Sequence, residues 1–134
     1  MLSRRGALMV AMRVSVVALV AILVPLAACD RNAEQEAIRL TGGRPARGRE
    51  LIRHYGCVSC HTIPGIRGAD ALVGPPLAGI ASRAYIAGVL PNTPGDMMHW
   101  IRNPQAVDSL TAMPNTGVTA GDARDIAAYL YTLR

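Results

Sequence analysis

The strongest constraint on this chain is the short run Cys57–His61, which has the sequence Cys-Val-Ser-Cys-His. Two cysteines separated by two residues and followed at once by a histidine form the attachment motif for a c-type haem. The two thiols add across the two vinyl groups on one side of the porphyrin, and the histidine ligates the iron from one face. The motif therefore predicts one covalent haem c, bound by Cys57, Cys60 and His61, with His61 as an iron ligand.

Two other kinds of site also use a Cys-x-x-Cys pair. A redox dithiol would suit an oxidising compartment, but a histidine follows this pair directly and the chain shows no thioredoxin-like strand pattern. A zinc site would need further ligands at a familiar spacing, and no second Cys or His pair follows. The sequence therefore favours haem over both alternatives.

The composition supports a cofactor at the centre of the fold. The chain has 134 residues, which is enough for one domain, and it contains four Tyr, one Trp and no Phe. Large aromatic side chains usually fill much of a small core. A domain this short and this poor in rings needs another source of core, such as a cofactor, a metal or a partner. A haem would supply it.

Residues 1–28 have the pattern of a lipoprotein-type signal peptide. Arg4, Arg5 and Arg13 form a positive region beside the apolar run 14–24, which is too short to span a bilayer comfortably. The sequence Leu-Ala-Ala-Cys that ends at Cys29 resembles a bacterial lipobox, so we expect lipidation of Cys29. The alternative is an uncleaved anchor helix with an incidental cysteine. The predicted location is the periplasmic side of a bacterial membrane.

Without that leader the chain is only mildly basic. It keeps 11 Arg against nine acids and has no Lys. With so few aromatic residues this gives no basis for nucleic-acid binding. Residues 29–43 are polar and end in Thr-Gly-Gly, so we expect a lipid-anchored tether there. A short helix around Glu34–Leu40 would have nothing to pack against.

Apolar periodicity and helix-start residues predict an all-α domain over residues 44–134. The predicted helices run over 45–55, 77–83 and 94–102 and from 120 to the end of the chain, with 85–92 irregular and 103–117 a long loop. Thr93 and Thr119 each have an Asp three residues later, which is typical of a helix N-terminus. The last helix carries an apolar stripe at Ile126, Leu130 and Leu133, so we expect it to be amphipathic.

Met113 is the predicted ligand on the other face of the iron. It lies in the long loop and is followed by Pro114, which stiffens its backbone. Long loops without secondary structure are usually functional, although a Met packed into the core is the alternative. Four rival ligands are less suitable. Met97 and Met98 lie in a predicted helix, His54 is too close to Cys57 to cross the ring, and His99 suits a surface position.

These residues together resemble the class I monohaem cytochromes c. The resemblance rests on Cys57–His61, the Gly-Pro-Pro-Leu run at 74–77, Trp100, the pair Met113-Pro114 and the terminal helix around 126–130. The runs 90–94, 100–105 and 113–115 are also similar to the cytochrome c domain fused to subunit II of some haem–copper oxidases. Here we expect the domain to stand alone on a lipid anchor, without the copper-binding domain.

The resemblance implies the fold and several residue roles. The N- and C-terminal helices would cross, and helices and loops would enclose the haem. The Pro75 carbonyl would accept a hydrogen bond from the His61 imidazole, and Trp100 would approach a haem propionate. Gly48 on the first helix would cross Tyr129 and Leu130 on the last.

The predicted function is that of a periplasmic, membrane-tethered one-electron carrier with His/Met ligation in a respiratory chain. Such a carrier is an electron-transfer protein and not an enzyme, and it has no small-molecule substrate. By resemblance, its donor would be a cytochrome bc complex and its acceptor a terminal oxidase. The alternatives are an electron-entry subunit of a larger respiratory complex, or a haem enzyme or sensor with an open sixth position.

Overall fold

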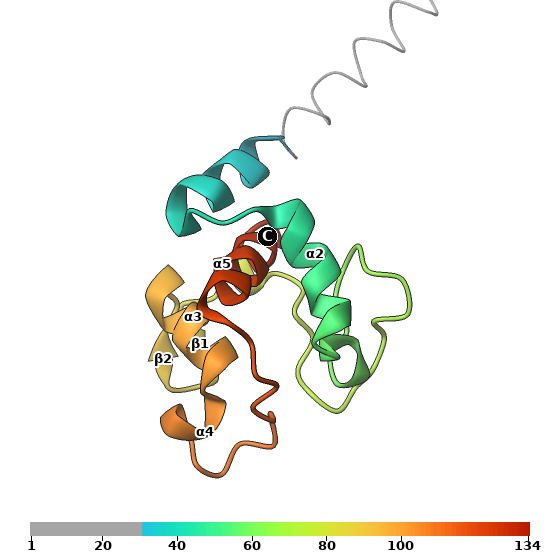
Figure 1. The fold of residues 1–134 in the computed structure, drawn as a ribbon, viewed down its shortest axis with the longest axis vertical. Helices are drawn as coiled ribbons and strands as arrows, with labels where there is room; N and C mark the ends of the chain where they lie inside the picture. The colour runs from blue at the N-terminus through green and yellow to red at the C-terminus, as the bar shows by residue number, and fades with distance from the viewer. Residues whose placement is uncertain (1–30) are drawn as a thin grey trace, which may run out of the picture. The chain divides into compact units, whose positions relative to one another are not determined.

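The computed structural model describes residues 31–134 (Figure 1). The predicted signal peptide, residues 1–28, and the predicted lipidation site, Cys29, lie outside the described residues. Residues 31–41 are helical, and we call them helix 31–41. The elements that follow are α2 (Pro45–His54), the 3-10 turns η1 (Cys57–Ser59) and η2 (Ile80–Ser82), β1 (Tyr85–Ile86), β2 (Leu90–Pro91), α3 (Pro94–Arg102), α4 (Pro104–Val107) and α5 (Ala120–Leu130). No helix among these residues is long and apolar enough to cross a membrane.

The helix starts are where the capping residues predicted them. The Thr93 hydroxyl oxygen accepts a hydrogen bond from the Asp96 backbone N–H at 3.1 Å and begins α3. The Thr119 hydroxyl oxygen accepts one from the Asp122 backbone N–H at 3.2 Å and begins α5. These contacts satisfy N–H groups that have no partner within the helix. The all-α prediction is confirmed.

The crossing of α2 and α5 is the tightest contact between helices. A Cβ atom added at Gly48 would overlap the backbone carbonyl of Asp125 and lie 3.1 Å from Cα of Ile126. Only glycine allows the two backbones to approach this closely. The predicted crossing is confirmed, but its register was wrong, because the crossing point lies at Asp125 and Ile126. The Tyr129 hydroxyl instead donates to the Pro64 carbonyl at 2.6 Å and so packs on a loop.

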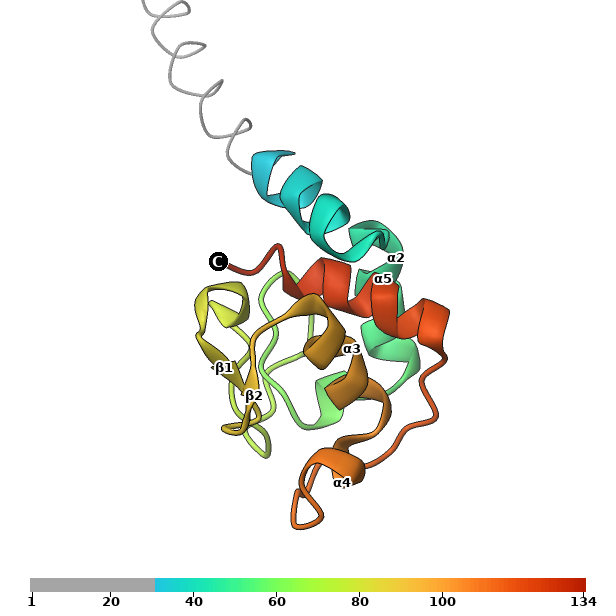
Figure 2. The ribbon, with the colours of Figure 1, turned by 90° about the vertical axis from the view of Figure 1, so that its left-hand side faces the viewer.

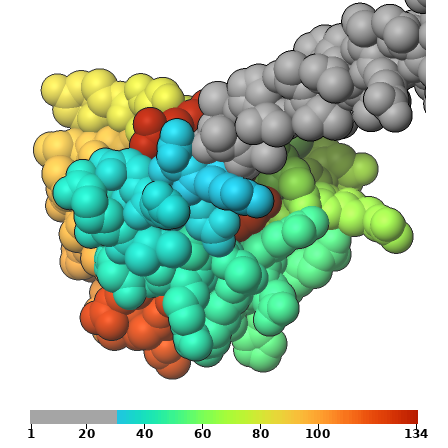
Figure 3. All heavy atoms as spheres, turned by 90° about the horizontal axis from the view of Figure 1, so that it is seen from above, coloured from blue at the N-terminus to red at the C-terminus, as the bar shows by residue number. Residues whose placement is uncertain are grey.

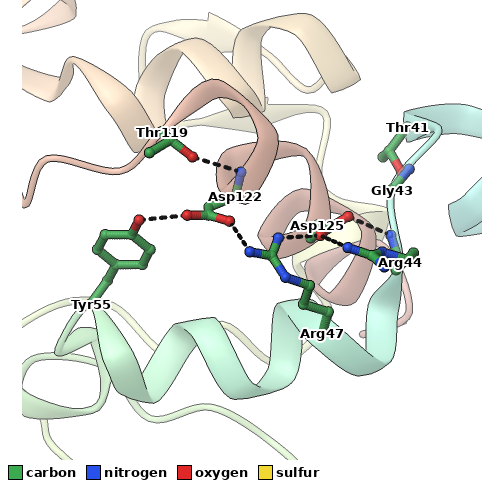
Figure 4. A network of polar contacts seen from close by, with 8 residues as sticks. All are labelled: Thr41, Gly43, Arg44, Arg47, Tyr55, Thr119, Asp122 and Asp125. Atoms are coloured by element: carbon green, nitrogen blue, oxygen red, sulfur yellow. Dashed lines mark hydrogen bonds and ion pairs between the residues drawn. The ribbon is translucent and has the colours of Figure 1, made fainter.

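Ion pairs and hydrogen bonds hold this crossing from the side, as Figure 4 shows. Arg47 on α2 contacts Asp122 at 2.5 Å and Asp125 at 2.6 Å, both on α5. Asp125 also accepts the Arg44 backbone N–H at 2.8 Å, and the Tyr55 hydroxyl donates to Asp122 at 2.6 Å. We call these five residues the clamp.

The clamp shifts the acidity of both carboxylates. The hydrogen bond from Tyr55 lowers the pKa of Asp122 most, and Thr119 and Arg47 lower it further. Burial works to raise the pKa of Asp125, but its bonds to Arg47 and to the Arg44 N–H outweigh burial and leave it lowered. Both carboxylates therefore favour the charged form in the folded state.

The last helix is buried on more sides than the predicted apolar stripe alone requires. Every residue from Asp125 to Leu130 is buried, since α2 and α3 pack against α5 and residues 33–41 lie beside it (Figure 2). The predicted stripe at Ile126 and Leu130 does face the core. The small residues Ala127 and Ala128 let other elements cover the remaining sides.

The polar segment before α2 is not a flexible tether over its whole length. Ala37 is fully buried in the core cluster, and Thr41 is buried. The Thr41 hydroxyl donates to the Ala37 carbonyl at 2.7 Å and accepts the Gly43 N–H at 3.0 Å. Ala33–Arg134 form one compact unit, so the folded domain begins before residue 44. In Figure 3, residues of this segment lie over the C-terminal part of the chain. The expectation that a helix here would have nothing to pack against was wrong, because the small residue Ala37 packs into the core.

Three smaller elements also differ from prediction. Strands β1 and β2 pair antiparallel, with Ile86 opposite Leu90, where the sequence predicted irregular structure. Two-residue strands are too short to show an alternating pattern. The turn between them contains Ala87 and Gly88 at φ +53° and +74°. The helix predicted over 77–83 shrinks to η2, and α4 interrupts the long loop.

Candidate functional site

A cavity of about 260 Å³ lies within the domain. This volume is far above the roughly 10–15 Å³ that a single water needs, so the cavity is of a size for a ligand. Its walls are mostly apolar, with Ile52, Ile80, Met97, Ile126 and Leu130 among the lining residues. The cavity also brings together the sequence-predicted site residues Cys57, Cys60, His61, Pro75, Trp100 and Met113.

The local fold presents the two cysteines together. Gly56, at φ +74°, ends α2 in the left-handed conformation that glycine favours. In the 3-10 turn that follows, the Cys57 carbonyl accepts the backbone N–H of Cys60 at 3.3 Å and that of His61 at 3.1 Å. Side chains three residues apart in such a turn lie on the same side. The spacing therefore places two free thiols along one edge of the cavity.

The thiol chemistry argues against the two alternative sites. Burial raises the pKa of the Cys57 thiol, whereas catalytic redox cysteines have lowered pKa values. Among residues 31–134, no three His, Cys, Asp or Glu side chains gather closely enough to hold a metal ion. A redox dithiol and a zinc site are therefore both disfavoured.

The His61 ring is fixed on two sides. Its Nδ1 lies 2.7 Å from the Pro75 carbonyl oxygen, which is the contact that the resemblance implies. Gly74 packs on the ring, since a Cβ atom there would lie 2.5 Å from Cε1 and 2.7 Å from Nδ1 of His61. The Gly74 N–H also donates to the Cys60 carbonyl at 2.7 Å. The hydrogen bond at Nδ1 leaves Nε2 free to ligate a metal ion.

Met113 is held by its neighbours in the C-terminal loop. The Gln105 side-chain amide donates to the Met113 carbonyl at 2.7 Å, and the Met113 N–H donates to the Thr111 hydroxyl oxygen at 3.2 Å. The side chain is half-buried and lines the cavity. The backbone of this loop is thus fixed without a regular element.

The rival ligands are placed differently. Met97 also lines the cavity, but it is buried within α3 as part of the core. Met98 packs against the same core, half-buried. His54 is exposed, with its ring edge-on to Tyr55 at a centroid distance of 4.9 Å, and His99 is exposed. Neither histidine lines the cavity.

Sequence analysis missed three residues that shape the site. Gly74 was noted only within a loop motif, although its contact with His61 requires a glycine. Gln105 gave no signal of its own. Arg83 is the one Asp, Glu or Arg side chain that lines the cavity in the part of the chain described. Its guanidinium donates to the carbonyls of Pro76 at 2.6 Å and Ala78 at 3.0 Å. Arg83 can therefore neutralise an anionic group of a bound cofactor.

Comparison with known proteins identifies the domain. The Cytochrome c family model matches residues 45–134. This chain belongs to the cytochrome c family. A covalently bound haem c with its iron and an electron-transfer role follow from that membership, and the cavity fits such a group through its paired thiols, fixed imidazole and apolar walls.

Two curated relatives are cytochrome c oxidase subunits. The chain is 30% identical over 89 residues to cytochrome c oxidase subunit 2 of Alkalihalophilus pseudofirmus, which covers 66% of this chain and 25% of the relative. It is 29% identical over 87 residues to the same subunit of Bacillus subtilis, covering 63% of this chain and 24% of the relative. The cytochrome c chain spans about a quarter of the length of these relatives. The predicted resemblance to the cytochrome c part of oxidase subunit II is confirmed.

Proposed function

We propose that this cytochrome c carries single electrons in a respiratory chain, with its haem iron held between His61 and Met113. The observation that carries the proposal is that both side chains line one cavity, with the His61 ring and the backbone of Met113 each held by a hydrogen bond. When bound, the haem supplies an iron that cycles between the ferric and ferrous states. The role of the protein is to hold that iron and to limit what can reach it.

His61 is prepared as a ligand before the iron arrives. Its Nδ1–H donates to the Pro75 carbonyl at 2.7 Å, which selects the tautomer with a lone pair on Nε2. Such a bond also raises the basicity of the ligating nitrogen. Gly74 holds the ring from the side, so little rearrangement is needed on ligation.

Met113 would supply the second protein ligand to the iron. A thioether is a soft ligand that raises the reduction potential of a haem. With His61 and Met113 both bound, the iron would have no place for a substrate, which favours a carrier over an enzyme or a gas sensor. We therefore propose that the protein is not an enzyme and has no small-molecule substrate.

The partners are redox proteins of the respiratory chain. We propose a cytochrome bc complex as donor and a terminal oxidase as acceptor, by resemblance to the family. The two oxidase-subunit relatives favour a second candidate, in which this domain is the electron-entry subunit of a larger complex. Both candidates use the same haem chemistry and differ only in how long the partner stays bound.

We further propose that a lipid on Cys29 holds the protein at the periplasmic face of the membrane. The support is the lipobox-like sequence ending at Cys29. Two or more acyl chains anchor a protein firmly. In a Cys29→Ser variant that is still exported, the protein should move to the soluble fraction with unchanged spectrum and potential. Retention in salt-washed membranes would contradict the lipid anchor.

The ligand proposal is tested by replacing the two cavity methionines. Met113→Ala should abolish the weak sulfur-to-iron charge-transfer band, lower the midpoint potential and allow carbon monoxide to bind the ferrous protein. Met97→Ala is the matched control and should keep the band, because Met97 packs within α3. Persistence of the band in Met113→Ala would assign the ligand role to another residue. Rapid carbon monoxide binding by the unmutated protein would favour the enzyme or sensor class.

A further inference from the structure

Four of the segments that line the cavity contain no charged residues, whereas the segment 77–83 contributes Arg83 to the lining. The runs 55–66, 71–76, 84–93 and 109–121 have no Asp, Glu, Lys or Arg. Each of them contributes lining residues, such as Cys57, Val73, Ile86 and Met113. The carboxylates and guanidinium groups of the described residues all lie elsewhere in the chain.

Exposed apolar side chains concentrate on the same segments. Leu72 is 82% exposed, Val73 is 77% exposed and Leu110 is 92% exposed, and Tyr85 and Val89 are also exposed. Val73 lines the cavity itself, and Leu110 precedes the lining residue Thr111. We call Leu72, Val73, Tyr85, Val89 and Leu110 the rim. Of the other large apolar residues in the described part, only Ile38 and Leu40 are exposed, to the smaller extents of 44% and 37%, and both lie on helix 31–41.

Three of the charges that flank these segments are engaged within the chain, whereas Arg67 and Asp70 are exposed. Arg83 donates to the carbonyls of Pro76 and Ala78. The Asp108 carboxylate accepts the Leu110 N–H at 2.9 Å. Asp122 belongs to the clamp, where Arg47 and Tyr55 contact it. A partner that covers the rim would therefore meet apolar side chains and few free charges.

We propose that the rim is an apolar, uncharged docking surface for a redox protein whose own electron-exchange surface is also apolar and uncharged. This inference rests on the proposed function and names the kind of partner that it requires. If a partner carried a ring of charged side chains, these would lose their hydration on the rim and gain no opposite charges there. That loss is costly in free energy. An apolar partner gains the free energy of removing rim side chains from water.

The inference has a kinetic consequence. Charged docking surfaces steer their partners, and the association rate then falls steeply as salt is added. An uncharged rim gives association that changes little with ionic strength. During exchange one electron leaves the ferrous iron of one molecule and reduces the ferric iron of the other, with no proton or bond transferred.

Electron self-exchange supplies a defined probe, because the partner is then a second copy with the same rim. We would measure the self-exchange rate of the haem-loaded protein by NMR of mixed ferric and ferrous samples. Between about 0.01 M and 1 M ionic strength the Debye length falls from about 30 Å to about 3 Å. The expected result is a change in rate of less than about twofold over that range. A steep salt dependence of the unmutated protein would overturn the proposal.

Two double variants separate local charge from net charge. Leu72→Glu/Leu110→Glu places acids on the rim, and Ile38→Glu/Leu40→Glu adds the same charge on helix 31–41. The rim variant should exchange at least about tenfold more slowly at low ionic strength and recover at high ionic strength. The helix variant should exchange at the same rate as the unmutated protein, although its net charge equals that of the rim variant. Equal behaviour of the two variants would show that the rim is not the contact surface.

A second measurement does not depend on electron transfer. In the fully ferrous protein, concentration-dependent amide shifts should map to the four uncharged segments and not to α2. Shifts centred on α2 that vanish with salt would instead indicate a charged docking face.

Cyclic voltammetry tests the proposed carrier role independently of the rim. A reversible one-electron wave in every variant preserves the carrier role whatever the rim does, and its absence in the unmutated protein would refute the carrier role itself.

Discussion

The crossing of α2 and α5 and the loops around the cavity are held together by different kinds of interaction. At the crossing, backbones touch at Gly48 and charged side chains bond across the helices in the clamp. Around the cavity, the side chains of Gln105, Arg83 and His61 fix the loops by hydrogen bonds to backbone carbonyls of other residues. The difference indicates a division of labour, in which the crossing supplies stability and the loops fix the surroundings of the iron. Changes at the crossing should alter stability, and changes in the loops should alter the potential.

The largest expected effect is the loss of the fold when Gly48 is enlarged. In Gly48→Ala the added methyl group would overlap the Asp125 carbonyl, so α2 and α5 must move apart. We expect destabilisation of at least about 3 kcal/mol, at the upper end for overpacked sites. Thermal unfolding followed by circular dichroism of the haem-loaded protein measures it.

Gly121→Ala is the matched control, because no atom lies within 4 Å of a Cβ there. It should be neutral, or stabilise by roughly 0.5–1 kcal/mol as alanine replaces glycine in a helix. If both variants had the same melting temperature, the close approach at Gly48 would not be a source of stability.

A smaller effect is expected from the clamp, and it should depend on pH. The folded-state pKa of Asp125 is lowered, so its stabilising contribution is present above the unfolded-state pKa of about 3.9 and is lost as the pH falls through the folded-state value. Asp125→Asn should cost about 1–2 kcal/mol at neutral pH, allowing for solvent screening of the half-exposed Arg47. The cost should shrink below about pH 4.

Denaturant unfolding at several pH values measures that dependence, and the midpoint potential at neutral pH should stay unchanged. Asp70→Asn, at an exposed position, is the control. A pH-independent cost for Asp125→Asn would mean that its charge is not what stabilises the crossing.

The smallest expected change in stability, with a clear change in the potential, comes from Gly74→Ala. The added methyl group would press on the His61 ring and weaken the bond to the Pro75 carbonyl. A less basic imidazole stabilises ferric iron less, so the midpoint potential should rise. The expected size is of the order of 59 mV, which corresponds to a tenfold ratio for a one-electron couple.

Voltammetry and thermal melts on the same sample separate the two effects. A large loss of stability without a shift in potential would reverse the roles that we assign to the loops and the crossing. Gly121→Ala again serves as the control, since it lies far along the chain from the ring and should move neither quantity much.

Local patterns let the sequence determine much of this protein. The spacing of Cys57, Cys60 and His61 places two thiols and an imidazole together through a single turn, and the haem prediction follows from covalent geometry alone. Thr93 and Thr119 mark helix starts because an N-cap bonds to an N–H only three residues away. Interactions this short in sequence separation are visible before any folding is known.

Contacts between distant segments were decided only by the tertiary structure. The sequence could not show that Ala37 is buried beneath its own helix, or that α5 is covered on several sides. Nor could it show that Gly74 packs on His61 or that Arg83 lines the cavity. The sequence also could not show that α2 crosses α5 at Asp125. Small residues give no periodic signal, and their value depends on which backbone the fold brings against them.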